Sequence, residues 1–403
     1  METAAFSVIL AGRGVGHLHQ RGDYARVERQ QGYGDGPNRP VLGLRFEDQP
    51  AQPVASALRL PPWFSNLLPE GRLRAWVAHD AGVNADREMM LLRRLGADLP
   101  GAVVVARANG EIQPRWEPDR FIAAPAPIAE SHNRFRFSLA GVALKFSMLQ
   151  DGERLTMPTH AQDGDWIVKM PDSTYADLPH NEFGIMTLAR HVGIEVPEIR
   201  LVDRADVPEL PPRAWPAGQD VAYAIKRFDR SPGGRVHVED LAQVRGFYPD
   251  EKYKGSFATL AALVYRGHDL GSYLEFVRRL FFSYAVGNGD MHLKNLSLIY
   301  RDGRRPALSP AYDLVSTAPY REDEEDLGLK LGHSRRFADV TQTSFHLLAR
   351  SVGAPIDQTL HTVADVAGRL EAAWEIARPC LENLPVHTAY LDERIPQIAR
   401  RFG

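Results

Sequence analysis

The stretch GNGDMHLKN, residues 287 to 295, gathers an acid, an imidazole, an ammonium group and an amide between two apolar runs. Asp290 and Asn295 are separated by four residues, the spacing at which phosphotransferases hold a catalytic base and a magnesium ligand on one loop. Asp313 follows after a predicted hairpin. Phosphoryl transfer needs such groups because a carboxylate orients the attacking hydroxyl while Mg²⁺ on oxygen ligands neutralises the developing charge. The pattern therefore indicates phosphotransfer chemistry.

Other residues could bind the phosphate donor. His292 could donate to a phosphate, and Lys169, near the end of the predicted strand in DGDWIVKMP, could pair with the α- and β-phosphates. The small residues around Gly141 could cover the nucleotide with backbone amides. Each feature alone has an ordinary structural explanation, such as a solvated strand end or a turn. Their order along the chain, however, is that of a kinase, and the order favours phosphotransfer.

The elements that must position these groups can be predicted from hydrophobic patterning. FSVILAGRGVGHLHQ and VLGLRFE predict a small antiparallel sheet, in which Gly12, Gly14 and Gly16 lack the spacing of a dinucleotide-binding loop and indicate a simple turn. Residues 131 to 230 are strand-rich, with one amphipathic helix in NEFGIMTLARHVGI. After about residue 240 the pattern becomes helical.

We therefore expect an α+β protein with a kinase-like two-lobe fold, whose N-lobe is strand-rich and whose C-lobe is all-helical. An extra small subdomain of sheet and helix precedes the lobes. The Pro-rich segment AAPAPIAE reads as a linker. The predicted domains are residues 1–125 for the first subdomain, 126–235 for the N-lobe with its phosphate loop, and 236–403 for the C-lobe with the catalytic loop.

Composition excludes several classes of protein. The 403 residues are 44% hydrophobic and 25% charged, as in ordinary globular proteins. The formal charge of -3 does not mark the whole chain as a polyanion binder. Cys380 is the single cysteine, so an internal disulfide and a cysteine-based metal site are excluded. No apolar run approaches the roughly 18 residues of a membrane helix. We expect a cytoplasmic protein without membrane contact.

Taken together, these motifs closely resemble the HipA family of bacterial serine/threonine kinase toxins, over nearly the whole chain. In the first subdomain the resemblance is carried by VILAGRGVGHL, FSNLLPEGRLR and LLRRLGADLPGAVVV. In the kinase part it is carried by FSLAGVALKFSM (phosphate loop), WIVKMP (lysine strand), NEFGIMTLAR (helix), AIKRFDR (nucleotide hinge), GNGDMHLKN (catalytic loop) and AYDLVST (metal segment). Because all these motifs occur in the family's order, the likeness is specific.

The resemblance implies ATP and Mg²⁺ as cofactors, with Asp290 as catalytic base and with Asn295 and Asp313 as metal ligands. The residues implied to contact the nucleotide and its metal are Ala140, Gly141, Val142, Ala143, Leu144, Lys145, Lys169, Lys226, Arg227, Phe228, His292, Leu293, Lys294, Asn295, Tyr312 and Asp313. Ser138 matches the serine that such kinases phosphorylate in themselves to switch off. Glu182 corresponds to the kinase helix glutamate only by position, and it is left out of the predicted site.

The resemblance also implies partners. These are a small helix-turn-helix antitoxin, similar to HipB, and a protein substrate such as glutamyl-tRNA synthetase; DNA would be contacted only through the antitoxin. Two other functions stay open. One is a catalytically inactive kinase fold that acts as a corepressor or binding module, against which the four residues Lys169, Asp290, Asn295 and Asp313 argue. The other is a small-molecule phosphotransferase, against which the large first subdomain argues.

The chain departs from the family pattern in two places. Ala143 and Leu144 stand where the family usually has Gln followed by Pro or Glu, so polar contacts from the phosphate loop are altered. Lys226 stands in the hinge where an acidic residue can occur. Adenine recognition by backbone groups of the hinge would survive this change.

Overall fold

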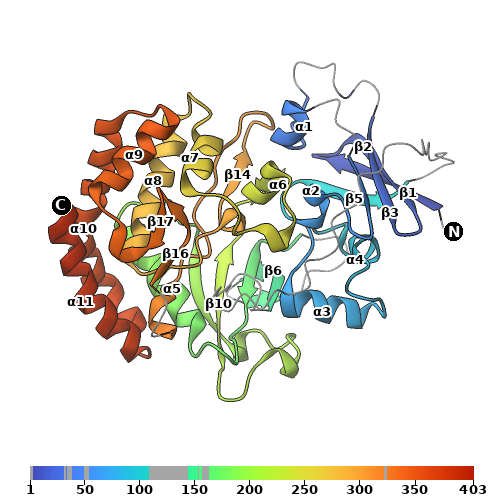
Figure 1. Cartoon of the computed structure of the whole chain (residues 1–403). Helices are drawn as coiled ribbons and strands as arrows, with labels where there is room; N and C mark the ends of the chain where they lie inside the picture. The colour runs from blue at the N-terminus through green and yellow to red at the C-terminus, as the bar shows by residue number, and fades with distance from the viewer. Residues whose placement is uncertain are drawn as a thin grey trace. The chain divides into compact units, whose positions relative to one another are not determined.

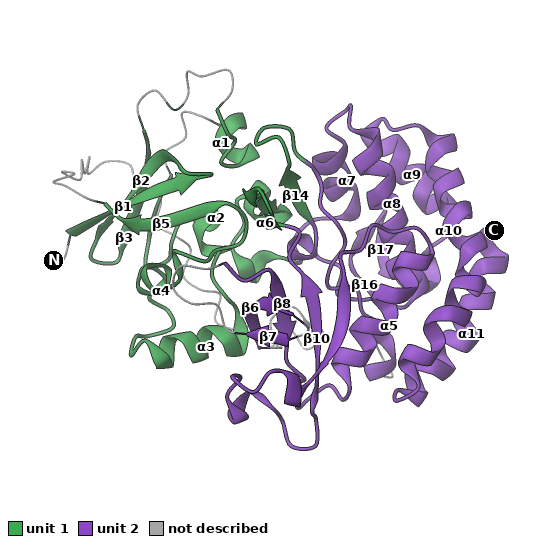
Figure 2. Ribbon diagram, turned by 180° about the vertical axis from the view of Figure 1, so that it is seen from behind, with its two compact units in different colours: residues 1–136, 229–252, 297–306 green, residues 137–228, 253–296, 307–403 purple. Residues whose placement is uncertain are grey.

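The computed structural model describes residues 3–30, 33, 39–49, 54–108, 144–152, 154–156, 163–321 and 325–403. The chain forms two compact units, each built from several segments (Figure 2). Unit 1 comprises residues 1–136, 229–252 and 297–306, and unit 2 comprises residues 137–228, 253–296 and 307–403. The domain boundaries predicted near residues 125 and 235 stay predictions.

Unit 1 is built on a five-stranded sheet with the strand order β4-β3-β2-β1-β5 (Figure 1). The strands are β1 (Thr3–Leu10), β2 (Arg13–Arg21), β3 (Tyr24–Arg29), β4 (Val54–Ala57) and β5 (Val103–Arg107). A two-residue turn joins β1 to β2, and its residues Ala11 and Gly12 have φ values of 47° and 77°. Turns of this kind match the twist of a hairpin. The predicted simple turn in this Gly-rich stretch is confirmed, whereas the prediction that VLGLRFE belongs to the sheet is wrong, because a short helix, Leu44–Asp48, begins within this stretch.

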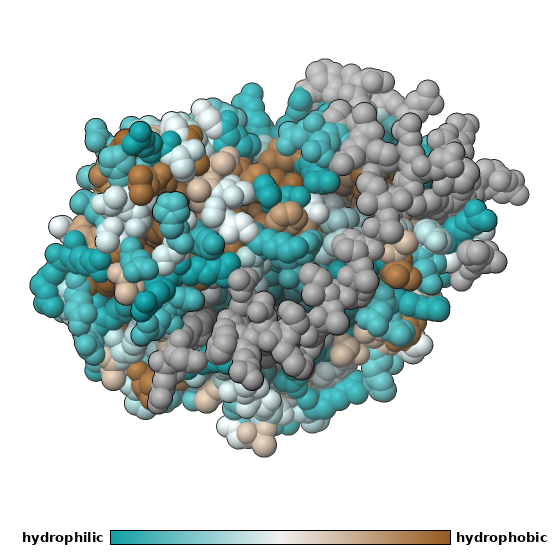
Figure 3. All heavy atoms as spheres, in the orientation of Figure 1, coloured by the Kyte–Doolittle hydropathy of each residue, from teal (hydrophilic) through white to brown (hydrophobic). Residues whose placement is uncertain are grey.

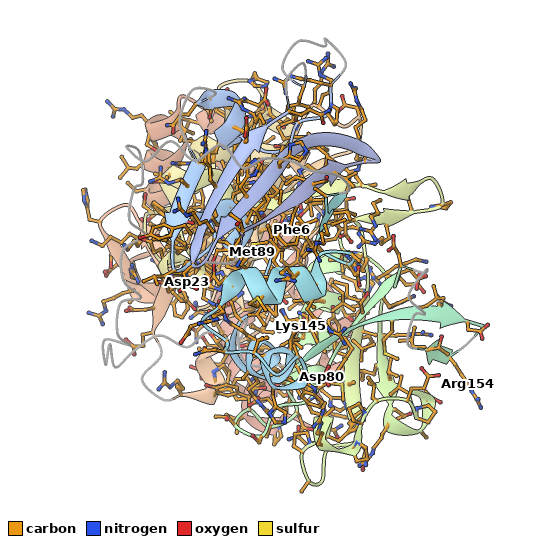
Figure 4. All side chains as sticks on the ribbon, turned by 90° about the vertical axis from the view of Figure 1, so that its right-hand side faces the viewer. Phe6, Asp23, Asp80, Met89, Lys145 and Arg154 are labelled. Carbon is orange, nitrogen blue, oxygen red and sulfur yellow. The ribbon has the colours of Figure 1, made fainter. Side chains whose placement is uncertain are left out.

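Helices cover the sheet of unit 1 and close its core. They are α1 (Leu44–Asp48), α2 (Pro62–Ser65), α3 (Gly71–Asp80), α4 (Glu88–Leu95) and α6 (Leu241–Arg245). Unit 1 also contains two paired strands, β13 (His237–Asp240) and β14 (Ser297–Tyr300). Phe6 of β1 and Met89 of α4, both labelled in Figure 4, belong to this core. Trp63 of α2 is 1% exposed and packs against Phe46 and Phe64. Alternating apolar residues in the strands and apolar helix faces together account for this packing.

The strand-rich part of unit 2 is a second antiparallel sheet with the order β7-β6-β8-β10-β9. Its strands are β6 (Lys145–Asp151), β7 (Arg154–Thr156), β8 (Trp166–Lys169), β9 (Ile199–Asp203) and β10 (Val221–Lys226). Helix α5 (Leu178–His191) packs against β9 and β10 and buries Ile185, Met186 and Leu188. The strand order places β8 between β6 and β10, so a residue at the end of β8 is flanked by both neighbouring strands.

The rest of unit 2 is mainly helical. Its helices are α7 (Phe257–Tyr265), α8 (Leu270–Ala285), α9 (Gln342–Val352), α10 (Ile356–Ala377) and α11 (Pro385–Phe402). Its short strands are β15 (Ala307–Leu308) and the hairpin β16 (Asp326–Leu331) and β17 (Ser334–Arg336). The part of the chain expected to be all-helical thus also contains short strands. Strand β16 reads DLGLKL, with leucine at every second position, so an alternating pattern was present in the sequence and the prediction missed it.

Among the described residues, no helix is both long enough and apolar enough to span a membrane. On the face drawn in Figure 3, hydrophilic residues predominate and hydrophobic residues form small separate groups.

Candidate functional site

Three side chains of the candidate site share one row across the sheet of unit 2. Lys169 at the end of β8 pairs with Lys145 of β6 on one side and with Tyr223 of β10 on the other. Directly paired residues of antiparallel strands point to the same face. The register therefore places two ammonium groups and a tyrosine ring together. The position of Lys145 at the start of β6 can be followed in Figure 4.

Lys169 is held between two carboxylates. Its Nζ lies 2.5 Å from Oε1 of Glu182 on α5, and it also donates to Oδ1 of Asp313. Lys145 Nζ lies 3.8 Å from Oδ2 of Asp313. Burial lowers the pKa of Lys169 to about 8, while the carboxylate of Glu182 acts in the opposite direction. The lysine thus has a charge that depends on pH close to the physiological range.

The catalytic loop begins where α8 ends. Gly287 has a φ of 67°, and a Cβ placed on it would lie 2.4 Å from the hydroxyl of Tyr390, so the turn requires glycine. The segment after Asp313 holds the loop in place. The Ser316 hydroxyl donates to the carbonyl of Val286, and the Gly289 amide donates to the Thr317 hydroxyl. These bonds connect the positions of Asp290 and Asp313, although the two residues are distant in sequence.

Helix α5 fixes the same segment from the other side. The side-chain amide of Asn181 donates to the carbonyl of Ser316 at 2.8 Å and accepts from its amide at 3.0 Å. Asn181 is fully buried. Because α5 also supplies Glu182, one helix positions both the partner of Lys169 and the metal segment.

Asp290 is 1% exposed and lies inside a hydrogen-bonded turn. Its amide donates to Oδ1 of Asn288, and its carbonyl accepts from the side-chain amide of Asn295 at 2.8 Å. Oδ1 of Asp290 accepts from the hydroxyl of Tyr253 and lies 4.0 Å from Nε2 of His292. These contacts orient the carboxylate. Asp290 lines a pocket whose other residues are Lys145, Lys169, Met170, Leu178, Pro179, Glu182, Tyr223, Asp313 and Val315.

Asn295 and Asp313 are the two residues predicted to bind a magnesium ion, and their side chains can be compared with the ligands that this ion prefers. Asn295 is 7% exposed, and its Oδ1 is buried without a hydrogen-bond partner among the described residues, a costly state that a bound cation would relieve. Both residues line a second pocket, and Asp313 has a φ of 55°, a left-handed conformation uncommon for aspartate. An amide oxygen and a carboxylate are the hard ligands that Mg²⁺ takes from proteins, with nucleotide phosphates and water completing its shell. These two residues therefore fit the ion.

Clusters of three or more histidine, cysteine, aspartate or glutamate side chains able to hold a metal are not found among the described residues.

The predicted hinge comprises Lys226, Arg227 and Phe228, and Phe228 contributes an aromatic ring. This ring lies 5.7 Å from that of Tyr312, whose hydroxyl donates to the carbonyl of Lys294. The Lys226 and Arg227 amides donate to the carbonyls of Glu198 and Asp165, so they are engaged within the protein. The Lys226 ammonium pairs with Glu198 at 3.2 Å, and the Arg227 guanidinium donates to Ser147. Of this group, the rings of Phe228 and Tyr312, tilted by 32° to each other, are the better candidates for contact with a nucleobase.

The structure brings Lys145, Lys169, Asp290, Asn295 and Asp313 into one region of unit 2, with His292 beside Asp290. Their roles stay predictions. Ser138 and residues 140 to 143 lie outside the described residues. Leu144 is described and 2% exposed, so its side chain belongs to the core.

Sequence reasoning missed two contributors. Glu182 was left out, yet it pairs with Lys169; its helix and spacing from the lysine strand were the available signal. Tyr253 was not considered, and no motif marks it.

Comparisons with known proteins agree with this geometry. Residues 137–374 match the model of the HipA-like C-terminal domain, and residues 6–106 match that of the HipA N-terminal domain. "Putative kinase Y4dM" of Sinorhizobium fredii is 42% identical over 372 residues, covering 90% of this chain and 88% of that protein. "Putative kinase Y4mE" of the same organism is 28% identical over 319 residues, covering 72% of each chain.

One solved structure has the same fold over nearly its full length. It is a complex of HipA, HipB and operator DNA from a Shewanella oneidensis toxin–antitoxin system. The TM-score is 0.76 at 21% sequence identity, covering 98% of this chain and 97% of that chain. The predicted kinase-like α+β fold is confirmed.

Proposed function

This chain belongs to the HipA family, and on that premise we propose that it is an ATP- and Mg²⁺-dependent protein serine/threonine kinase. The observation that carries the proposal is the convergence of Lys169, Asp290 and Asp313 on one pocket of unit 2, next to the unpartnered amide oxygen of Asn295. An inactive binding module would have no need for a buried acid and a buried lysine at the same pocket. Family relatives named as kinases support the same conclusion.

The residues of the chain divide the work of phosphoryl transfer among them. Asp290 would accept the proton of the acceptor hydroxyl, and the hydrogen bonds of its backbone amide and carbonyl hold the residue in its turn. Lys169 and Lys145 would exchange Asp313 for the negatively charged phosphates of ATP. Glu182 would keep Lys169 in place during that exchange. Mg²⁺ held by Asn295 and Asp313 would neutralise charge on the phosphates.

Further contacts belong to the same proposal. The backbone of residues 140 to 145 would cover the phosphates, His292 to Lys294 would contribute to the phosphate side, and Phe228 with Tyr312 would enclose the adenine. Phosphorylation of Ser138 would place about -1.5 to -2 charges beside the ATP phosphates and switch the kinase off by repulsion. Mass spectrometry after incubation with ATP tests this switch: no phosphate on Ser138, together with a fully active Ser138→Asp variant, would refute it.

We also infer a toxin role with a helix-turn-helix antitoxin of the HipB type as partner. Support comes from family membership and from the Shewanella oneidensis complex, in which a HipA chain is assembled with HipB and operator DNA. Contact with DNA would pass through the antitoxin, in keeping with the net charge of -3. The protein substrate would be a translation component such as an aminoacyl-tRNA synthetase. Failure of the protein encoded by the neighbouring gene to co-purify with this chain would argue against the partner.

The kinase proposal is tested by transfer of label from γ-³²P-ATP to proteins of a cell lysate. The wild type is compared with Asp290→Asn, which keeps the size of the side chain and removes the base. We expect labelled protein with the wild type and a rate at least about 10²-fold lower with the variant, because general-base catalysis supplies about 10² to 10⁴. Equal labelling by both proteins would refute the assignment of Asp290, and absence of labelling by either would refute the kinase.

A further inference from the structure

Tyr253 makes a contact that neither the motifs nor the proposed chemistry requires. Its hydroxyl donates a hydrogen bond to Oδ1 of Asp290, the carboxylate proposed as the base. A general base receives the hydroxyl of its substrate through a hydrogen bond of the same kind. The phenol of Tyr253 therefore occupies one of the positions from which an acceptor hydroxyl can donate to Asp290.

Two neighbours orient the tyrosine in this position. Its ring makes an edge-on contact with the ring of His292, at 5.0 Å between centroids and an interplanar angle of 76°. Its carbonyl accepts a hydrogen bond from the guanidinium of Arg335, at 3.5 Å. The ring thus occupies the space beside the catalytic loop as well as one acceptor position of Asp290.

The tyrosine lies on a short segment outside the helices and strands. It precedes α7 and is followed by Lys254 and Gly255, which are both exposed. Gly255 has a φ of 109°, a conformation essentially limited to glycine, and a Cβ placed on it would contact nothing within 4 Å. Tyr253 itself is only partly buried, so withdrawal of its ring would not have to begin inside the core.

We propose that Tyr253 marks the subsite for the acceptor hydroxyl, fills it in the nucleotide-free protein, and withdraws when a substrate hydroxyl binds to Asp290. This inference rests on the proposed kinase function. In the transfer step the proton of the substrate hydroxyl passes to Asp290 as its oxygen bonds to the γ-phosphorus of ATP. The bond from that phosphorus to the β,γ-bridging oxygen breaks, and ADP leaves. Tyr253 competes with the acceptor for Asp290 and takes no covalent part in the step.

The competition can be measured with water as the acceptor, so that the identity of the protein substrate does not matter. Release of ADP from Mg²⁺-ATP is followed for the wild type and for Tyr253→Phe, which keeps the ring contact with His292 and removes the hydroxyl. We expect the variant to hydrolyse ATP about tenfold faster or more, with an unchanged KM for ATP, because a hydrogen bond to a charged group is lost from the resting state only. The double variant Tyr253→Phe with Asp290→Asn should return to the low rate.

A matched control is Tyr273→Phe, which removes a buried hydroxyl that bonds to Thr359 between α8 and α10. This variant should leave hydrolysis at the wild-type rate. A Tyr253→Phe rate equal to or below the wild-type rate would overturn the inference, because the phenol would then orient the base or have no role. Phosphate found on Tyr253 itself would also overturn it, by making the residue an acceptor. If neither the wild type nor Tyr253→Phe consumes ATP or labels protein, the proposed function itself is wrong.

Discussion

Buried carboxylates occur in both units, and their partners differ. In unit 1, Glu239 is 0% exposed and accepts hydrogen bonds from the Leu44 amide, the Trp63 indole and the Tyr300 hydroxyl. In unit 2, Glu182 and Asp313 pair with the ammonium of Lys169 at a pocket. Glu239 is held by neutral donors that belong to the packed core. Glu182 and Asp313 are held by a cation, the ammonium of Lys169, which an anionic ligand can attract.

This difference separates a structural carboxylate from a functional one. The three donors of Glu239 connect α1, α2 and β14, and burial raises the pKa of Glu239 to about 7. Loss of its bonds would leave buried donors unsatisfied, which costs stability. In the proposed function, by contrast, Asp313 would exchange Lys169 for a cation, and Lys169 would exchange Asp313 for a phosphate. Matched substitutions in the two units test this difference.

The largest expected effect is that of Asp313→Asn on phosphate transfer. Removal of a metal ligand should lower the rate on the order of 10²-fold or more, since a bound cation contributes several kcal/mol to stabilising charge in the transition state. The matched variant Glu239→Gln should keep a rate close to that of the wild type. Transfer of label from γ-³²P-ATP measures both. A larger loss of activity in Glu239→Gln than in Asp313→Asn would reverse the comparison.

The next effect concerns nucleotide affinity. Lys169→Met removes an ammonium aimed at the phosphates and should weaken binding by about 1.5–3 kcal/mol, the range for hydrogen bonds to charged groups. Lys252→Met is the control, because Lys252 pairs with Glu70 within unit 1 at 3.3 Å. Titration calorimetry with a non-hydrolysable ATP analogue gives both affinities. Equal weakening of nucleotide binding by the two substitutions would contradict a direct contact between Lys169 and the phosphates.

The next prediction concerns the stability of the fold and the carboxylate of Glu239 in unit 1. In Glu239→Gln one end of the side chain becomes a donor facing another donor, so one buried group loses its partner. We expect the free energy of unfolding to fall by about 1–3 kcal/mol. Chemical denaturation followed by circular dichroism measures the change, and the affinity for the nucleotide analogue should not move. An unaltered unfolding curve would show that the three hydrogen bonds of Glu239 contribute no net stability.

The smallest effect is a pH dependence of nucleotide affinity. Phosphates bind the protonated form of Lys169, whose pKa in the free protein is about 8. Above this pH, binding must be accompanied by uptake of a proton, so affinity should be about tenfold lower at pH 9 than at pH 7. Lys169→Arg keeps its charge over this range and should flatten the profile. Identical profiles for the two proteins would exclude Lys169 as the titrating group.

The sequence was sufficient where the residues are close along the chain. Asp290, His292 and Asn295 lie on one short loop, so their proximity followed from the sequence, while their catalytic role stays a prediction. The predicted kinase-like fold also followed from the order of motifs, because hydrophobic periodicity identifies strands and helices.

Other contacts depend on tertiary packing and could not be read from the sequence. The pairing of Lys169 with Glu182 requires α5 to lie at a definite distance from the end of β8, which is set by the apolar residues between them. Tyr253 precedes Asp290 by 37 residues and carries no motif, so the fold alone reveals their contact. The three donors of Glu239 come from separate segments for the same reason.

The central claim is that the pocket of unit 2 binds ATP together with Mg²⁺ at Asn295 and Asp313. Titration calorimetry with a non-hydrolysable ATP analogue, with Mg²⁺ and with EDTA, tests it most directly. The account predicts tighter binding by the wild type when Mg²⁺ is present, and the loss of that difference in Asp313→Asn. Equal affinity of the wild type with and without Mg²⁺ would contradict the account.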